Sequence, residues 1–160
     1  MLIWAYSYNI KNIAYAVEWE KKNMKIPYNL KNEGNMYDFK EIESEKYISL
    51  ETYRKNNQPV KTPVLFVIKD NLIYVVTGDK TGKVKRLRNN LQVKFALCTI
   101  RGKVTGEWVS GTAKILTEEE TKEAVKWRGK KYGFFWKIAS LLDRKKGKFF
   151  AFSIKIIEKI

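Results

Sequence analysis

The sequence predicts a mainly β protein, in which six antiparallel strands form a closed or partly closed barrel with peripheral helices. Six segments are apolar or alternate between apolar and polar residues, and most turns between them have two to six residues. The last strand follows the longest helix, and short antiparallel connections with a late return strand are typical of barrels. The 160 residues are enough for one domain that buries a sizeable core.

The individual elements follow from alternation, turns and caps. Ile48, Leu50 and Thr52 alternate with their neighbours, which is a strand signature. Asp70-Asn71 favours a tight turn, and Thr117 and Glu120 have the spacing of a capping box at a helix start. The expected strands cover residues 46–54, 60–69, 72–76, 91–100, 108–116 and 149–157. The expected helices cover residues 38–45, 82–89 and 117 to about 143, the last with a break near Gly133.

Residues 36–160 are expected to form the domain, because the regular pattern begins at Met36. Residues 1–35 are expected to be an N-terminal extension. Glu33-Gly34 is encoded by a purine-rich tract, GAR-GGN, just upstream of the Met36 codon, so we interpret Met36 as a possible translation start. The alternative is a genuine helix at about residues 10–22.

The composition excludes several kinds of chemistry. The chain has no histidine and one cysteine, so Ser-His and Cys-His catalysis and the usual zinc sites are absent. One cysteine also forbids an internal disulfide, which favours a cytoplasmic location, and Cys98 is expected to be a small core residue. No membrane span is expected, because the longest apolar candidate, residues 134–142, is interrupted by Lys137 and is shorter than the roughly 20 residues required.

The charge favours an anionic partner. The 32 Lys and Arg against 17 Asp and Glu give a formal net charge of +15. Residues 80–106 hold eight basic and no acidic residues, and residues 121–148 hold ten basic and two acidic residues. Such surfaces suit nucleic acid, an acidic membrane, or a phosphorylated and carboxylated ligand.

The first basic stretch begins with a candidate phosphate site, TGDKTGKVKRLR at residues 77–88. Glycines at a strand end let the backbone approach an anion, and Lys83 and Arg86 add positive charge. A P-loop is rejected, because the spacing between the glycines is one residue too short and Val84 stands where a magnesium-binding Ser or Thr is needed. A solvated basic helix is the alternative.

Proline and aromatic residues mark further positions. Thr62-Pro63-Val64 places a proline in a strand, so this strand must bulge or lie at a sheet edge. A planar ligand can reach backbone groups at such a position. The alternative is that the strand merely bends there. Trp108, after a basic loop, suits a subunit interface or the core better than base stacking or cofactor contact. Residues 134–136, Phe-Phe-Trp, suit core or dimer contacts, and contact with membrane lipids is the alternative.

These segments together resemble a known family. YISLETY at residues 47–53 and PVKTPVLF at 59–66 resemble the first hairpin of the pyridoxamine-phosphate-oxidase-like flavoprotein superfamily. YVVTGDKTGKVKRLRNNLQV at 74–93 and RGKVTGEWVSGTA at 101–113 are similar to the subgroup described as probable coenzyme F420-dependent oxidoreductases. The resemblance covers roughly residues 44–157.

The resemblance implies an FMN-binding split β-barrel, a homodimer, and cofactor sites at the dimer interface that hold F420 or FMN. The backbone of Thr62, Pro63 and Val64 would lie beside the cofactor ring, and Trp108 would come from the partner subunit. The residues that would hold the cofactor phosphate are Thr77, Gly78, Lys80, Thr81, Gly82, Lys83 and Arg86. No catalytic side chain is expected, because the cofactor carries the chemistry.

The predicted function is hydride transfer between reduced F420 and an unidentified small organic substrate. The phosphate and glutamate tail of F420 suit the two basic surfaces. The use of F420, together with a chain rich in lysine, isoleucine and asparagine, favours an archaeal source. The first alternative is an FMN-binding electron carrier or flavin store of the same fold. The second is a small nucleic-acid-binding barrel that uses residues 80–103. Vitamin B6 oxidation is disfavoured, because residues 149–160 contain no arginine.

Overall fold

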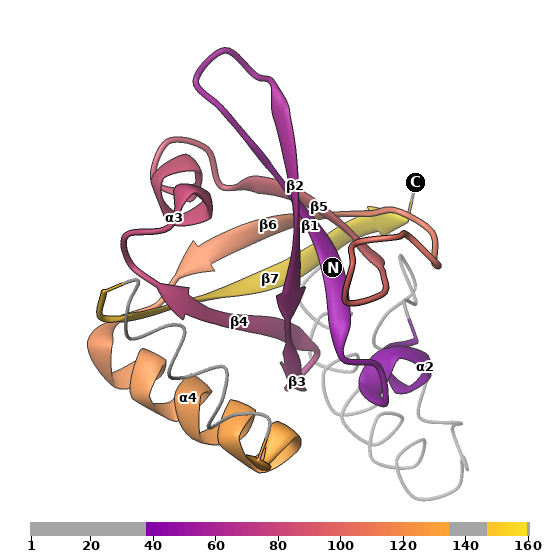
Figure 1. Cartoon of the computed structure of the whole chain (residues 1–160), viewed down its shortest axis with the longest axis vertical. Coiled ribbons are helices and arrows are strands. Elements are labelled where there is room, and N and C mark those ends of the chain that lie inside the picture. Colours follow the sequence, from indigo (N-terminus) through magenta and orange to yellow (C-terminus); the bar gives the residue numbers. More distant parts are fainter. Residues whose placement is uncertain (1–37, 135–146, 160) are drawn as a thin grey trace, which may run out of the picture. The chain divides into compact units, whose positions relative to one another are not determined.

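The computed structural model describes residues 38–134 and 147–159, and its strands form one antiparallel sheet (Figure 1). The strands are β1 (Tyr47–Tyr53), β2 (Pro59–Leu65), β3 (Val67–Lys69), β4 (Leu72–Gly78), β5 (Gln92–Leu97), β6 (Val109–Ile115) and β7 (Phe149–Lys159). The helices are α2 (Phe39–Glu43), α3 (Gly82–Leu87) and α4 (Glu118–Tyr132). The mainly β class is therefore confirmed, as are helices between β4 and β5 and between β6 and β7.

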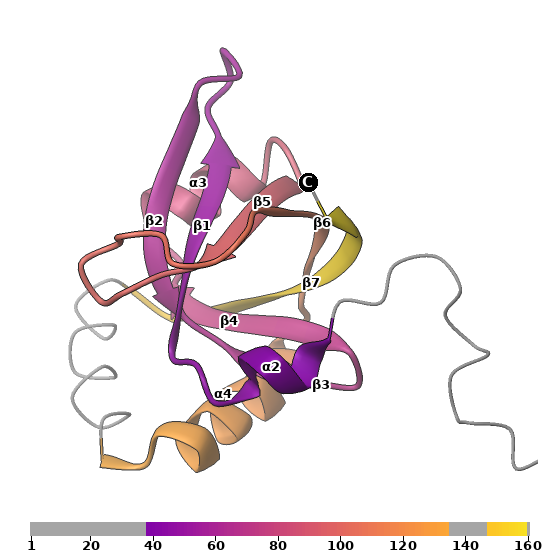
Figure 2. The same ribbon diagram turned by 90° about the vertical axis from the view of Figure 1, so that its right-hand side faces the viewer.

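The sheet curls into a half-barrel, as Figures 1 and 2 show. Its strand order is β2-β1-β5-β6-β7-β4-β3, so β2 and β3 are the two edge strands. These two strands are nevertheless consecutive in the chain and are separated only by Phe66. The chain thus passes directly from one edge of the sheet to the other, which brings the two edges together.

The sheet has seven strands, so the predicted number of six is wrong. The expected strand at residues 60–69 breaks at Phe66, because α4 supplies the hydrogen-bond partners of its backbone. The Phe66 N–H donates to the Tyr132 hydroxyl at 3.3 Å, and Lys131 Nζ donates to the Phe66 carbonyl oxygen at 3.3 Å. The Tyr132 hydroxyl also lies at hydrogen-bonding distance from that carbonyl oxygen. Because these backbone groups bond to side chains of α4, Phe66 does not pair with a neighbouring strand.

Strand β2 lies at the sheet edge, as Pro63 predicts, since it pairs only with β1. The Arg54 N–H donates to the Gln58 carbonyl oxygen at 2.9 Å, which sets the phase of the β1–β2 ladder. In an antiparallel pair, alternate residues turn their N–H groups toward the partner strand. Pro59 and Pro63 therefore occupy positions whose N–H would point to the open edge, where no ladder bond is lost.

The core lies on the inner face of the curled sheet. Its fully buried members come from five strands and from α3, and include Ile48, Leu50, Phe95, Phe152 and Ile154. The expected strand at residues 46–54 is thus confirmed as β1, although both of its faces are buried from Ile48 to Thr52. Cys98 is also buried, as expected for a small core residue, and burial raises the pKa of its thiol.

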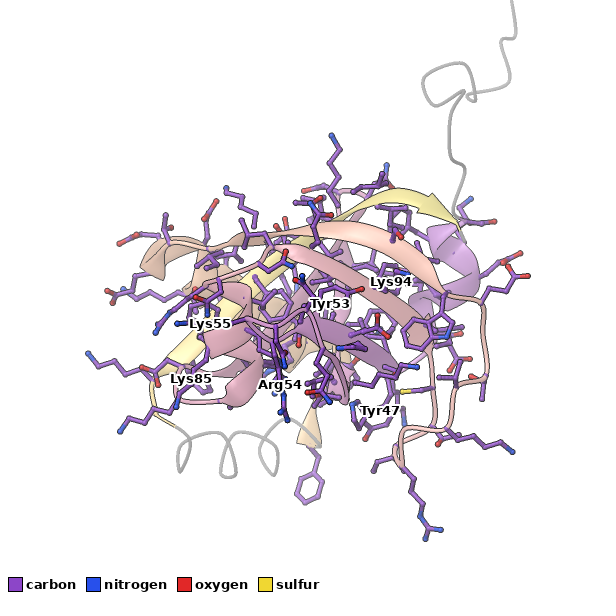
Figure 3. All side chains as sticks on the ribbon, turned by 90° about the horizontal axis from the view of Figure 1, so that it is seen from above. Tyr47, Tyr53, Arg54, Lys55, Lys85 and Lys94 are labelled. Atoms are coloured by element: carbon purple, nitrogen blue, oxygen red, sulfur yellow. The ribbon has the colours of Figure 1, made fainter. Side chains whose placement is uncertain are left out.

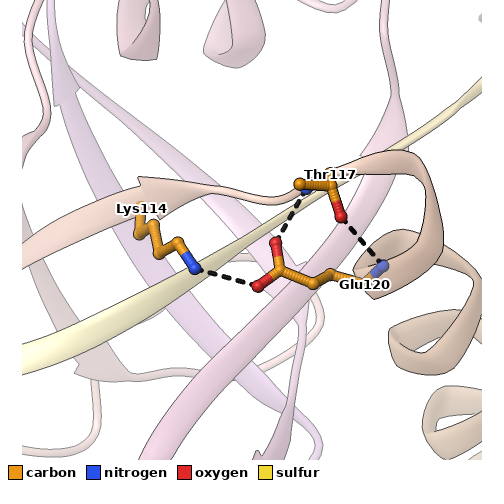
Figure 4. A network of polar contacts seen from close by, with 3 residues as sticks. All are labelled: Lys114, Thr117 and Glu120. Atoms are coloured by element: carbon orange, nitrogen blue, oxygen red, sulfur yellow. Dashed lines mark hydrogen bonds and ion pairs between the residues drawn. The ribbon is translucent and has the colours of Figure 1, made fainter.

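The predicted capping box at the start of α4 is confirmed (Figure 4). Thr117 Oγ1 accepts from the Glu120 N–H at 3.2 Å, and Glu120 Oε2 accepts from the Thr117 N–H at 2.8 Å. Helix α4 ends before Gly133, whose φ is 49°. Some expectations concern residues outside the described ranges. These are the continuation of the helix to about residue 143, the contacts of the aromatic residues 135 and 136, the domain start at Met36 and the extension 1–35. No described helix has the length and apolar character that a membrane crossing needs.

Helix α3 and the loop of residues 98–108 lie on opposite faces of the β1–β2 hairpin, as Figure 2 shows. Helix α3 packs against β1. The loop reaches β2 on the other face, where a Cβ on Gly102 would lie 3.8 Å from the Pro63 ring. The sheet thus separates the residues of the candidate phosphate site from the loop that carries Trp108.

Candidate functional site

The turn from β4 into α3 is fixed by backbone hydrogen bonds. The Asp79 N–H donates to the Lys148 carbonyl oxygen at 2.9 Å, and the Thr81 N–H donates to the Gly78 carbonyl oxygen at 3.3 Å. Thr77 and Gly78 are buried, whereas Lys80 is exposed. The turn therefore leads from the buried end of β4 into α3.

Lys83 and Arg86 are both anchored on threonine hydroxyls. Lys83 Nζ donates to Thr77 Oγ1 at 3.3 Å, and Arg86 Nε donates to Thr52 Oγ1 at 2.7 Å. A Cβ on Gly82 would lie 3.0 Å from Arg86 Nη1, so the glycine gives the guanidinium room against the first turn of α3. Desolvation and then the positive charge of Arg54 lower the pKa of Arg86. The structure thus brings together two of the predicted cations over β1 and β4.

Thr81 supplies a polar atom without a partner in this part of the molecule. It is the N-cap residue of α3, but its side chain makes no capping hydrogen bond. Its Oγ1 is buried and has no hydrogen-bond partner among the described residues. A buried hydroxyl in this state indicates a missing acceptor or donor, and a phosphate oxygen would supply an acceptor.

Thr62 faces the same side of the sheet as Thr52. The β1–β2 register pairs Leu50 with Thr62 and Thr52 with Val60, and residues two apart on a strand share a face. Val64, also on this face, is buried in the core. Pro63 points to the opposite face and contacts the loop at Gly102.

The ladder phase determines which amides of β2 are available at the open edge. The N–H groups of Thr62 and Val64 turn toward β1, and Pro63 has none. The alternation leaves the N–H groups of Lys61 and Leu65 at the open edge. Contact of the cofactor ring with Thr62, Pro63 and Val64 remains a prediction. The backbone donors available beside these residues are the N–H groups of Lys61 and Leu65.

Trp108 lies with Lys61 on the face of the sheet opposite to Thr62. Lys61 Nζ lies 4.6 Å from the centre of the Trp108 ring and 3.8 Å from Glu51 Oε2. The Tyr53 hydroxyl donates to the other carboxylate oxygen of Glu51 at 2.8 Å, and burial and this bond raise the pKa of Tyr53 to about 12. Within one chain, Trp108 therefore does not join the phosphate residues, and a contribution from a partner subunit remains a prediction.

Two residues of the site were not predicted from the sequence. Thr52 accepts from Arg86, and Arg54 is the second cause of the lowered pKa of Arg86. A signal for Thr52 was available, because it is the hydroxyl residue on a strand face whose other members, Ile48 and Leu50, are apolar. The signal for Arg54 was weaker, because a basic residue at a hairpin tip is usually only solvated.

A cavity adjoins the candidate turn at Asp79 and lies between the C-terminal end of α3, the start of α4 and the start of β7. Its volume is about 680 Å³. The lining residues are Asp79, Arg88, Leu116, Glu118, Thr121, Lys122, Val125, Gly147, Lys148, Phe149 and Phe150. Lys122 and Lys148 belong to the second basic stretch of the sequence. Asp79 of the candidate turn lines this cavity, whereas the predicted phosphate residues are not among its lining residues.

No group of three potential metal-ligating side chains occurs in the described ranges 38–134 and 147–159.

The chain belongs to the pyridoxamine 5'-phosphate oxidase family, whose model matches residues 38–158. The resemblance inferred from the sequence is thereby confirmed at the level of the family. The split-barrel class agrees with this family and with the half-barrel described above. No curated protein sequence matches the chain.

Several solved structures share the fold at low sequence identity. A conserved hypothetical protein, Rv2991 of Mycobacterium tuberculosis, is 20% identical, with a TM-score of 0.58 over 74% of this chain and 77% of its own. HutZ, a heme storage protein of Vibrio cholerae, is 16% identical, with a TM-score of 0.57 over 79% and 95%. A protein named F420 reductase is 13% identical, with a TM-score of 0.56 over 77% and 96%. At these identities the likeness concerns the fold.

Proposed function

We propose that this protein is an oxidoreductase that transfers a hydride between reduced F420 and a small organic substrate. The observation that carries the proposal is the pair of anchored cations, Lys83 on Thr77 and Arg86 on Thr52, beside the buried and unpartnered Thr81 hydroxyl oxygen. Hydroxyls that hold two cations side by side prepare a phosphate site before the ligand arrives. Family membership and the fold shared with an F420 reductase support a redox cofactor as the bearer of that phosphate.

The residues fit the phosphate of such a cofactor. Lys83 and Arg86 supply charged donors, and Thr77 and Thr81 supply hydroxyls at the end of β4. Gly78, Lys80 and Gly82 complete the predicted set, with the glycines allowing close approach of the backbone. The deazaflavin, when bound, supplies the hydride chemistry, and the protein positions it and its partner molecule.

A second copy of the chain is proposed to complete the site. The loop next to Trp108 exposes two apolar side chains, Ile100 at 66% and Val104 at 37%. Exposed apolar side chains beside a tryptophan favour a subunit contact. In such a homodimer we expect this loop of one protomer to lie toward the phosphate residues of its partner, and light scattering of the purified protein would measure the subunit number.

FMN binding is the second candidate, because Lys83, Arg86 and the two threonines suit any phosphate ester equally. Titration with F420 and with FMN, read by quenching of the five tryptophans, separates the candidates. We expect saturable quenching by F420 and weaker binding of FMN. Tighter FMN binding would select the FMN alternative. Binding of neither cofactor, with salt-sensitive binding of a single-stranded oligonucleotide, would favour the nucleic-acid alternative.

A further inference from the structure

Arg54 lies beside the candidate phosphate site, two residues closer to the tip of the β1–β2 hairpin than Thr52. It directly follows β1, and its N–H still donates to the Gln58 carbonyl oxygen, so the ladder geometry continues through it. Residues two apart on a strand share a face, and Arg54 therefore lies on the face where Thr52 accepts from Arg86. Figure 3, a view from above, labels Arg54 together with its neighbours Tyr53 and Lys55.

Arg54 and Arg86 are close enough for their charges to act on each other. The positive charge of Arg54 disfavours the charged form of Arg86, in addition to the larger effect of burial. The ion pairs found among residues 38–134 and 147–159 include neither arginine. Arg54 is exposed, so an anion that approaches Arg86 from solvent can meet both guanidinium groups.

We propose that Arg54 binds a second acidic group of the ligand, next to the phosphate held by Lys83, Arg86 and the threonines. The proposal rests on the function proposed above. Side chains two residues apart on a strand start about 7 Å from each other. Arg54 can therefore contact a part of the ligand that lies beyond the part bound next to Thr52. The ligand class is therefore a phosphate ester that carries at least one further carboxylate or phosphate.

This requirement distinguishes the two candidate cofactors. FMN has one phosphate group and no further acid, whereas F420 carries a phosphate and a glutamate tail. Binding the tail carboxylate at Arg54 would favour F420 over FMN without any difference in the ring systems. Arg54 is thus a specificity-determining residue rather than part of the phosphate cradle.

Arg54→Gln tests the proposal, with Lys55→Gln as a matched control that removes a neighbouring exposed charge. We expect Arg54→Gln to weaken F420 binding roughly 10- to 100-fold, the effect of one lost charge-assisted hydrogen bond. FMN affinity should change less than about threefold, and Lys55→Gln should leave both affinities nearly unchanged. Equal weakening of F420 and FMN would show that Arg54 binds the phosphate itself, and unchanged F420 binding would also overturn the proposal.

A simple anion separates failure of this proposal from failure of the proposed function. Sodium tripolyphosphate should raise the melting temperature of the native chain, and Arg54→Gln should lose most of that rise. If neither cofactor binds but this loss is found, the proposed cofactor is wrong and the paired-arginine anion site stands. If tripolyphosphate stabilises Arg54→Gln as much as the native chain, the site is overturned.

Discussion

The Nε–H of Arg86 in α3 donates to Oγ1 of Thr52 in β1 at 2.7 Å, which joins two elements 34 residues apart in the chain. Because Thr52 is almost completely buried, water has little access to its hydroxyl. The bond uses one guanidinium nitrogen and fixes the direction of the side chain. The position of the charge at the candidate phosphate site therefore depends on a residue of the sheet.

Thr52→Val removes this acceptor and keeps the shape of the side chain. We expect cofactor affinity to fall roughly three- to tenfold, because Arg86 loses its anchor and must be ordered by the ligand instead. Thr52→Ser retains the hydroxyl and should restore most of the affinity, as measured by tryptophan quenching. Equal affinities of the Val and Ser variants would show that the hydroxyl does not position Arg86.

Tyr132→Phe tests the connection between α4 and the corner of the sheet at Phe66. The phenol contacts the Phe66 N–H and the carbonyl oxygens of Phe66 and Lys46, and burial raises its pKa. We expect the free energy of unfolding in urea to fall by about 1–3 kcal/mol, because buried backbone groups lose their partners. Tyr53→Phe, whose hydroxyl is only partly buried, should cost less than about 1 kcal/mol. A smaller loss for Tyr132→Phe than for Tyr53→Phe would contradict this account.

Gly147→Ala tests the packing of the β4–α3 turn against the start of β7. A Cβ at Gly147 would lie 1.9 Å from Asp79 Oδ1, and the φ of 104° disfavours any other residue. Gly133→Ala is the matched control, because its φ is 49° but a Cβ there meets nothing within 4 Å. We expect Gly147→Ala to be the more destabilising change by about 1 kcal/mol or more in urea unfolding. Equal losses would show that the turn moves freely away from Gly147.

Glu120 makes the stability of the α4 start depend on pH. Its hydrogen bond with Lys114, and then that with the Thr117 N–H, lower the pKa of its carboxyl below the ordinary 4.5 (Figure 4). This contribution to stability is fully present above the unfolded-state pKa and is lost as the pH falls through the lower folded-state pKa. At pH 6, Glu120→Gln should therefore unfold at a lower urea concentration than the native chain. The difference should shrink toward pH 3, and a difference that grows with acidity would contradict the assignment.

The sequence was sufficient for the features that depend on local chemistry. Pro63 lacks an N–H and predicted a bulge or an edge strand, of which the structure has the edge strand, and Thr117 with Glu120 predicted a capped helix start. The break at Phe66 was not predictable, because its cause is the side chain of Tyr132, 66 residues away. The same limit applies to the site. Lys83 and Thr77 lie on adjacent elements and were both predicted, whereas Thr52 reaches Arg86 only after the sheet has formed.

The central claim is that the cations after β4 bind the phosphate of a redox coenzyme, and Lys83→Ala combined with Arg86→Ala tests it most directly. Each lost charged hydrogen bond is worth about 1.5–3 kcal/mol, with incomplete additivity, so the Kd for F420 should rise roughly 10- to 1000-fold. Lys69→Ala with Lys126→Ala removes the same charge from exposed ion pairs and should change the Kd less than about threefold. An unchanged Kd in a folded Lys83→Ala, Arg86→Ala variant would contradict the claim.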